Sequence, residues 1–169
     1  MTTENNASIT TREPFSDPSR PIVVGVDGSK TSLAALRHAA RLAPVLGLSL
    51  NAVALWDYPT SIYDVYEPTP DWSPEFDARK VLDEAAQTVF GDEAPDWFSS
   101  EVLRGTPARV LIEESKGASM LVLGSRGLGG FTGMLLGSVS RTVSAHAACP
   151  VLIVHADTAQ TDSAETDSA

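Results

Sequence analysis

The sequence predicts an α/β fold in which an open, five-stranded parallel sheet carries helices on both faces. Short apolar runs alternate along the chain with longer segments whose apolar residues have helical spacing. The runs are rich in Val, Ile and Leu, which is typical of strands that are buried on both faces of a parallel sheet. The length of 169 residues suits a single hydrophobic core and therefore one domain.

The first strand is expected at residues 22–26 (IVVGV), a β-branched run. Residues 27–29 (DGS) predict a tight turn, and the apolar spacing of the following LAALRHAARLAPVL predicts a helix that runs to Leu46. Residues 50–56 (LNAVALW) predict the second strand. A loop rich in proline and acidic residues follows that strand and ends near Pro74.

The middle of the chain continues the alternation. Apolar residues in 75–90 fit one helical face, and Gly91 is expected to end that helix. Residues 99–103 predict a weaker strand. Residues 107–115 predict a helix with proline in its first turn, and a buried strand is expected at 120–123 (MLVL).

A fourth helix is expected at 138–146 and a final strand at 151–155 (VLIVH). Both ends of the chain differ from this alternating middle. Residues 1–20 are polar and contain two prolines, and residues 156–169 contain four acidic residues without a base or a large apolar side chain. We expect both segments to be disordered tails around a folded domain at 21–155.

Composition excludes several classes of protein. Twelve Lys and Arg against twenty-two Asp and Glu give a net charge of −10, which argues against nucleic acid or an anionic membrane as a partner. The single cysteine, Cys149, cannot form an intramolecular disulfide, and we expect it to be an inert, small core residue. No apolar run is long enough for a membrane span and no secretory signal is evident, so a cytoplasmic location is expected.

A ligand site is expected beyond the carboxyl ends of the strands, at the point where the strand order reverses. The first loop at this edge holds Asp27 at the strand end, Gly28, which permits close backbone approach, and Ser29, which can cap the next helix. The same three residues are also ordinary turn and cap residues. Both interpretations of this loop stay open.

The second loop is richer in glycine. Five glycines precede Gly137 in it: Gly124, Gly127, Gly129, Gly130 and Gly133. Backbone N–H groups exposed by glycines can surround phosphates, and Ser138 and Ser140 can add hydroxyl donors where the next helix begins. Arg126 either reaches a phosphate or faces solvent. The loop lacks the Gly-Lys-Ser/Thr of a P-loop, and it comes too late in the chain for a dinucleotide fingerprint.

This spacing resembles that of the universal stress protein family. Its nucleotide-binding members carry Gly, two residues, Gly, nine residues, Gly and then Ser or Thr, and the chain matches with Gly124, Gly127, Gly137 and Ser138. IVVGVDGS near the start and CPVLIVH at the close add to the resemblance, which covers residues 21–155.

The resemblance implies a Rossmann-like, adenine nucleotide alpha hydrolase-like fold that binds ATP. It places Asp27 toward the adenosine end, the backbone near Leu55 beside adenine, and Gly127 near the ribose and phosphates. Around the phosphates it places Gly137, Ser138, Val139 and Ser140. The chain departs from the family at Leu55, where Ala-Leu-Trp stands in place of the histidine and valine of many members.

The leading hypothesis is therefore an ATP-binding module of a stress response or signalling pathway, in which nucleotide occupancy shifts a conformational or partner equilibrium. One alternative is a slow ATPase or an adenylyl or phosphoryl transferase, which would need a base and a held metal, such as Mg²⁺ on Asp27. A purely structural interaction protein is a third class. Residues 151–154 are apolar on both faces of an expected edge strand, and this together with the resemblance predicts a homodimer through that strand.

Overall fold

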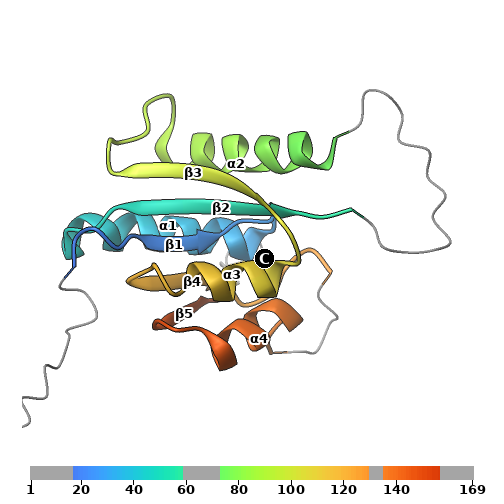
Figure 1. Cartoon of the computed structure of the whole chain (residues 1–169). Helices are drawn as coiled ribbons and strands as arrows, with labels where there is room; N and C mark the ends of the chain where they lie inside the picture. Colours follow the sequence, from blue (N-terminus) through green and yellow to red (C-terminus); the bar gives the residue numbers. More distant parts are fainter. Residues whose placement is uncertain (1–16, 59–72, 130–134, 157–169) are drawn as a thin grey trace, which may run out of the picture.

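The computed structural model describes residues 17–58, 73–129 and 135–156 (Figure 1). The expected tails, apart from residues 17–20 and Ala156, lie outside the described residues, as do Gly130 and Gly133 and all of the proline-rich loop between Tyr58 and Ser73. Within the described ranges, no helix combines the length and the apolar composition that a bilayer span requires.

Five strands and four helices alternate along the described parts of the chain. In order they are β1 (Ile22–Gly25), α1 (Lys30–Leu46), β2 (Leu50–Trp56), α2 (Pro74–Phe90), β3 (Phe98–Arg104), α3 (Pro107–Glu114), β4 (Met120–Gly124), α4 (Ser138–His146) and β5 (Val151–Val154). All neighbouring strands are parallel, in the order β3-β2-β1-β4-β5. The expected α/β fold is therefore confirmed.

The helices form a layer on each face of the sheet (Figure 1). α1 and α2 pack on one face, and α3 and α4 pack on the other. Right-handed crossovers explain this arrangement, because the chain moves outward from β1 to β3, then returns to β4 and continues in the opposite direction to β5. The reversal lies between β1 and β4, so the loops after these two strands diverge to opposite faces.

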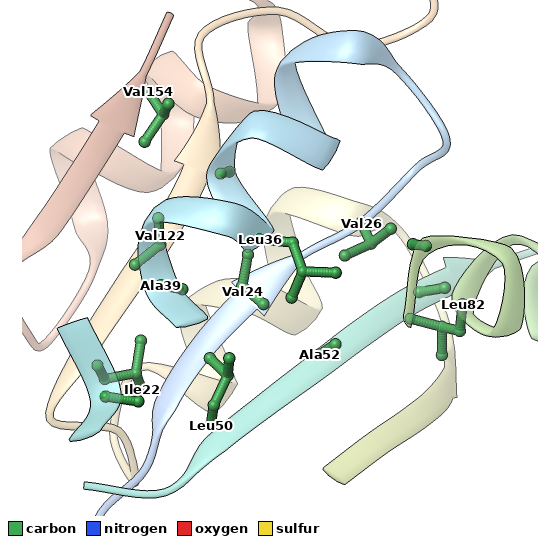
Figure 2. Close-up of a cluster of buried hydrophobic side chains, with 14 of the residues drawn as sticks. Ile22, Val24, Val26, Leu36, Ala39, Leu50, Ala52, Leu82, Val122 and Val154 are labelled. Atoms are coloured by element: carbon green, nitrogen blue, oxygen red, sulfur yellow. The ribbon is translucent and has the colours of Figure 1, made fainter. Parts of the chain in front are cut away.

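The larger core cluster lies between the sheet and the α1 and α2 layer. Figure 2 shows this cluster, with Leu36 of α1 beside Val24 of β1, and with Leu82 of α2 at its other side, nearer to Val26 and Ala52 than to Leu50. Leu36, Val24 and Leu50 have no exposed surface and Leu82 has only 1%. Complete burial of one such side chain contributes roughly 1.5–3 kcal/mol, so this layer holds the helices on the sheet.

Local caps set the helix ends. α1 begins at Lys30, upstream of the apolar run, because the Ser29 hydroxyl accepts a hydrogen bond from the backbone N–H of Ser32 at 3.1 Å. Ser73 caps α2 in the same way, and Gly91 ends that helix as predicted. α1 ends at Gly47, whose φ of 66° is the left-handed conformation that favours glycine.

β3 is longer than the sequence indicated. The prediction of a weak strand at 99–103 underestimated it, because all seven residues of β3 pair in register with β2, from Phe98 opposite Leu50 to Arg104 opposite Trp56. Pairing with a well-formed neighbour supplies the stability that the local sequence lacks. At the other edge β5 ends at Val154, one residue before the predicted end.

Candidate functional site

A cleft opens where the strand order reverses. Its volume is about 360 Å³, within the range of small-molecule sites. The carboxyl ends of β1, β2 and β4, the first turns of α3 and α4, and the glycine loop after β4 line it. The parallel sheet alone brings these segments together, because the carboxyl ends of its strands share one edge.

Most residues proposed from the sequence meet in this cleft. Those that line it are Asp27, Leu55, Gly124, Arg126, Gly127, Gly137, Ser138, Val139 and Ser140. Gly28 and Ser29 do not line it. Gly28 has a φ of 84° in the turn after β1, and Ser29 is the cap of α1, so the structure gives these two residues the turn and cap roles that the sequence left open.

Asp27 connects the first loop to the glycine loop. Its Oδ1 accepts a hydrogen bond from the Ser29 N–H at 3.0 Å, and its Oδ2 accepts one from the Leu128 N–H at 3.2 Å. A Cβ on Gly127 would lie 2.6 Å from that Oδ2. A side chain at Gly127 would therefore displace the carboxylate and break the connection between the loops.

A second connection joins the glycine loop to the start of α1. The Thr31 hydroxyl donates to the carbonyl oxygen of Arg126, and the Ser29 hydroxyl lies 3.1 Å from that of Thr31. A Cβ on Gly124 would lie only 2.7 Å from the backbone carbon of Thr31. Sequence analysis missed Thr31, for which the one available signal was a hydroxyl residue in the first turn of a helix at the ligand edge.

The N-terminus of α4 lines the cleft with backbone N–H groups that lack an acceptor among the described residues. The Gly137 N–H donates to the Ser125 carbonyl oxygen at 2.8 Å, and Gly137, as the cap, has no side chain that could accept from the helix. The N–H groups of Ser138, Val139 and Ser140 precede the first helical hydrogen bond. No hydrogen bond joins them to another described residue, and such a helix end attracts anions.

The two serines of this helix differ in what they offer a ligand. Ser138 is exposed, and its hydroxyl has no hydrogen bond to any described residue. Ser140 is 5% exposed, and its hydroxyl donates to the Gly124 carbonyl oxygen at 2.7 Å. The expectation of two hydroxyl donors is corrected accordingly, because the Ser140 hydrogen already joins α4 to the end of β4.

The wall opposite the glycine loop is apolar. Leu55, Leu123, Pro107 and Leu111 contribute to it, and Leu111 is 2% exposed. Only Leu55 was proposed from the sequence. Pro107 and Leu111 are one helical turn apart on α3, and a helix that starts after β3 at the ligand edge was the signal that could have found them.

Charge in the cleft is sparse. Among the described lining residues Asp27 is the one acid and Arg126 the one base. The parts of the chain that the structure describes contain no group of three His, Cys, Asp or Glu side chains that could hold a metal ion. His38 and His146 lie exposed on their own helices, where the ring Nδ1 of each is 2.9 Å from a carbonyl oxygen one turn earlier.

Comparison with known proteins identifies relatives along most of the chain. The model of the universal stress protein family matches residues 18–155. A universal stress protein of Mycolicibacterium smegmatis is 37% identical over 139 residues, which are 82% of this chain and 46% of that protein. The chain thus spans about half the length of the curated relatives it matches.

Two solved structures of universal stress proteins match this chain over nearly their whole length. A universal stress protein from Lactobacillus plantarum has a TM-score of 0.64 and 23% identity, over 82% of this chain and 99% of that one. A universal stress protein crystallised in complex with cAMP has a TM-score of 0.61 and 27% identity, over 83% of this chain and 100% of that one. These similarities agree with the sheet order and the helix layers described above.

Proposed function

Because the chain belongs to the universal stress protein family, we propose that it binds an adenine nucleotide, ATP, in the cleft between the loops after β1 and β4. One observation carries the proposal: three backbone N–H groups at the start of α4 have no hydrogen-bond partner among the described residues and face a glycine-lined cavity. Phosphate oxygens are the acceptors that such a helix end binds best.

The phosphates would lie on the α4 side of the cleft. Ser138 adds a hydroxyl that has no hydrogen bond to a described residue, and the exposed Arg126 lies in the loop between β4 and α4. Gly127 and Gly137 also line the cleft, and because they have no side chain a phosphate can approach their backbone closely. Apart from its chain neighbours, no atom of the described residues would lie closer than 3.5 Å to a Cβ on Gly137, so we expect the protein without ligand to accept a side chain that would obstruct a phosphate.

The base would lie against the apolar wall of Leu55, Pro107 and Leu111, with Asp27 toward the sugar. Flat apolar walls with a few fixed polar groups are typical of nucleotide sites. The 27% identical family member that was crystallised with cAMP supports an adenine nucleotide as the ligand class.

A magnesium ion would be held mainly by the nucleotide. Asp27 is the one carboxylate among the described lining residues, and both of its oxygens already accept backbone hydrogen bonds. Mg²⁺ usually takes one or two carboxylates and substrate phosphates, so Asp27 alone fits an accessory role.

In this proposal the nucleotide acts as a signal. Its occupancy shifts a conformational or partner equilibrium in a stress response. The described lining residues include no histidine or lysine that would serve as a base or as a P-loop cation. We further propose that the chain forms a homodimer through β5, an edge strand that pairs only with β4 among the described residues.

Two measurements test nucleotide binding. Small molecules released from the purified protein by denaturation are identified by mass spectrometry, and ATP is the expected result. Calorimetric titration with ATP then compares the wild type with Gly137→Val, for which we expect at least about a tenfold loss of affinity because the side chain obstructs backbone approach. Gly117→Ala, on the turn after α3, is the matched control. Unchanged affinity of Gly137→Val would rule out this placement.

A further inference from the structure

Arg104 makes aromatic contacts beyond the cleft that the proposed function does not use. Its guanidinium carbon lies 5.4 Å from the ring centroid of Trp56 and 5.1 Å from that of Tyr58. The two rings are themselves 5.4 Å apart in an edge-to-face arrangement at 83°. A guanidinium within about 6 Å of an aromatic ring is attracted to the ring, so one cation holds two rings here.

The backbone joins the same segments. Trp56 and Arg104 are opposite each other at the ends of β2 and β3. The Gly105 N–H donates to the Trp56 carbonyl oxygen at 2.8 Å, which extends the strand pairing by one bond. Gly105 has a φ of 137°, a conformation that other residues rarely adopt. The end of β2 is therefore fixed by its backbone and by its side chains.

This clamp holds the strand from the face opposite the cleft. Side chains alternate along β2, so Trp56 packs with the α1 and α2 layer, whereas Leu55 packs with the α3 and α4 layer and lines the cleft. Any movement of the Trp56 backbone is transmitted to Leu55, its direct neighbour. Arg104 forms no ion pair with another described residue, and its guanidinium contacts the two rings.

We propose that Arg104 is a positioning residue for base recognition: by clamping Trp56 and Tyr58 it holds the β2 backbone and Leu55 against the base of the bound nucleotide. The inference rests on the proposed nucleotide site and adds a determinant of its base specificity. The residue acts through the strand and does not contact the ligand. Loss of the clamp therefore weakens base selection and leaves the phosphate end of the site intact.

The test compares Arg104→Gln with Arg104→Lys and uses Arg109→Gln as the control. Arg109 lies on α3, and its guanidinium makes no cation–π contact with a described ring. Calorimetry gives the Kd for ATP and for GTP, which share the sugar and the phosphates. We expect Arg104→Gln to raise the Kd for ATP about threefold to tenfold and to reduce the GTP to ATP ratio of Kd values, with Lys intermediate. Arg109→Gln should match the wild type.

Hydrogen exchange supplies a readout that needs no ligand. The Gly105 amide should exchange faster in Arg104→Gln than in the wild type or in Arg109→Gln, because its acceptor at Trp56 is released. If the wild type binds neither nucleotide, the proposed function fails and the positioning role fails with it, whereas the exchange rates still report on the clamp. Binding of ATP with an unchanged ratio in Arg104→Gln, or no discrimination by the wild type, would overturn the inference alone.

Discussion

The glycines between the end of β4 and the start of α4 have different physical reasons to be glycine. Gly124 leaves room for the backbone of Thr31, Gly127 leaves room for the Asp27 carboxylate, and Gly137 has ordinary space around it. A Cβ on Gly124 would meet the backbone of Thr31, which cannot move without displacing α1. The close contact at Gly127 would be with a side chain. At Gly137 the nearest atom among the described residues, apart from the chain neighbours, would be 3.5 Å from an added Cβ.

Gly124→Ala should therefore destabilise the fold, whereas Gly137→Ala should not. The added methyl group of Gly124→Ala would overlap the first turn of α1, and such overpacking costs about 1–3 kcal/mol. Urea unfolding followed by circular dichroism measures the free energy of unfolding of both variants. Equal stability of the two variants would contradict the assignment of Gly124 as a packing residue.

Cys149 should be a slow nucleophile. Burial raises the pKa of its thiol, and the opposing effects of a hydrogen bond from the Leu121 backbone and of the Arg20 charge are smaller. At pH 8 the native protein should react with a disulfide reagent about tenfold more slowly than the chain in guanidinium chloride, because the thiolate is the reactive form. A native rate equal to the denatured rate would show an accessible, unperturbed thiol.

For single residues, the sequence predicted which positions belong to the site better than it predicted the contacts that each side chain makes. The spacing of Gly124, Gly127 and Gly137 could be recognised from the chain, as could the cap at Ser29. The hydrogen bond that uses the Ser140 hydroxyl could not, because its acceptor is a carbonyl oxygen sixteen residues earlier and becomes a neighbour only after β4 and α4 have packed.

At the scale of elements, α3 separates the cleft from a group of carboxylates beside β3. Its Pro107 and Leu111 side lines the cleft, and Glu113 and Glu114 lie on the side toward the end of β3. Burial raises the pKa of Glu114, and the charges of Glu101 and Glu113 raise it further. The folded protein therefore binds this proton more tightly than the unfolded chain does.

Stability should accordingly depend on pH through this residue. A raised pKa in an acid stabilises the fold at low pH, and that contribution is lost as the pH rises through the unfolded and then the folded pKa. Glu114→Gln should raise the free energy of unfolding at pH 7 by no more than about 1 kcal/mol, since the group is partly solvated. The gain should vanish at acidic pH, where the wild-type carboxyl is protonated in both states.

Denaturant unfolding of Glu114→Gln at several pH values measures this difference, with Glu93→Gln, at an exposed position between α2 and β3, as a control. A gain that persists at acidic pH would show that packing, and not charge, is the cause. The raised pKa itself was beyond sequence analysis, because Glu101 comes from β3 and approaches Glu114 only when α3 folds back on the sheet. The sequence predicted helix and strand boundaries well where a cap or a glycine marks them, as at Gly91. It predicted the bounds of β3 less well.

For the whole molecule, topology decides both the place of the cleft and the place of the exposed strand edge. Alternating strands and helices sufficed to predict a parallel sheet with a reversal, and a reversal fixes where a ligand can enter. The same order leaves β5 at the edge. Val151, Leu152 and Ile153 are half-buried there in the single chain, and of the four strand residues only Val154 is buried, at 6% exposure.

The homodimer is the prediction at this scale. Leu152 packs toward the α1 and α2 layer and Ile153 toward the α3 and α4 layer, so a second β5 along the free edge would complete the cover of both side chains and pair the open N–H and C=O groups. A two-fold axis makes this contact self-complementary. Multi-angle light scattering at micromolar concentration should therefore give twice the chain mass of 17.9 kDa.

Leu152→Lys and Ile153→Lys should each shift the protein toward the monomer, because a charge at the seam has to be buried. Thermal unfolding of each variant separates loss of the dimer from loss of the fold, since a folded monomer keeps a cooperative transition. Lys in place of Val151, at the start of the strand, should have a smaller effect. A wild type that stays at 17.9 kDa at every concentration measured would refute dimerisation through β5 and leave the half-buried edge for another partner.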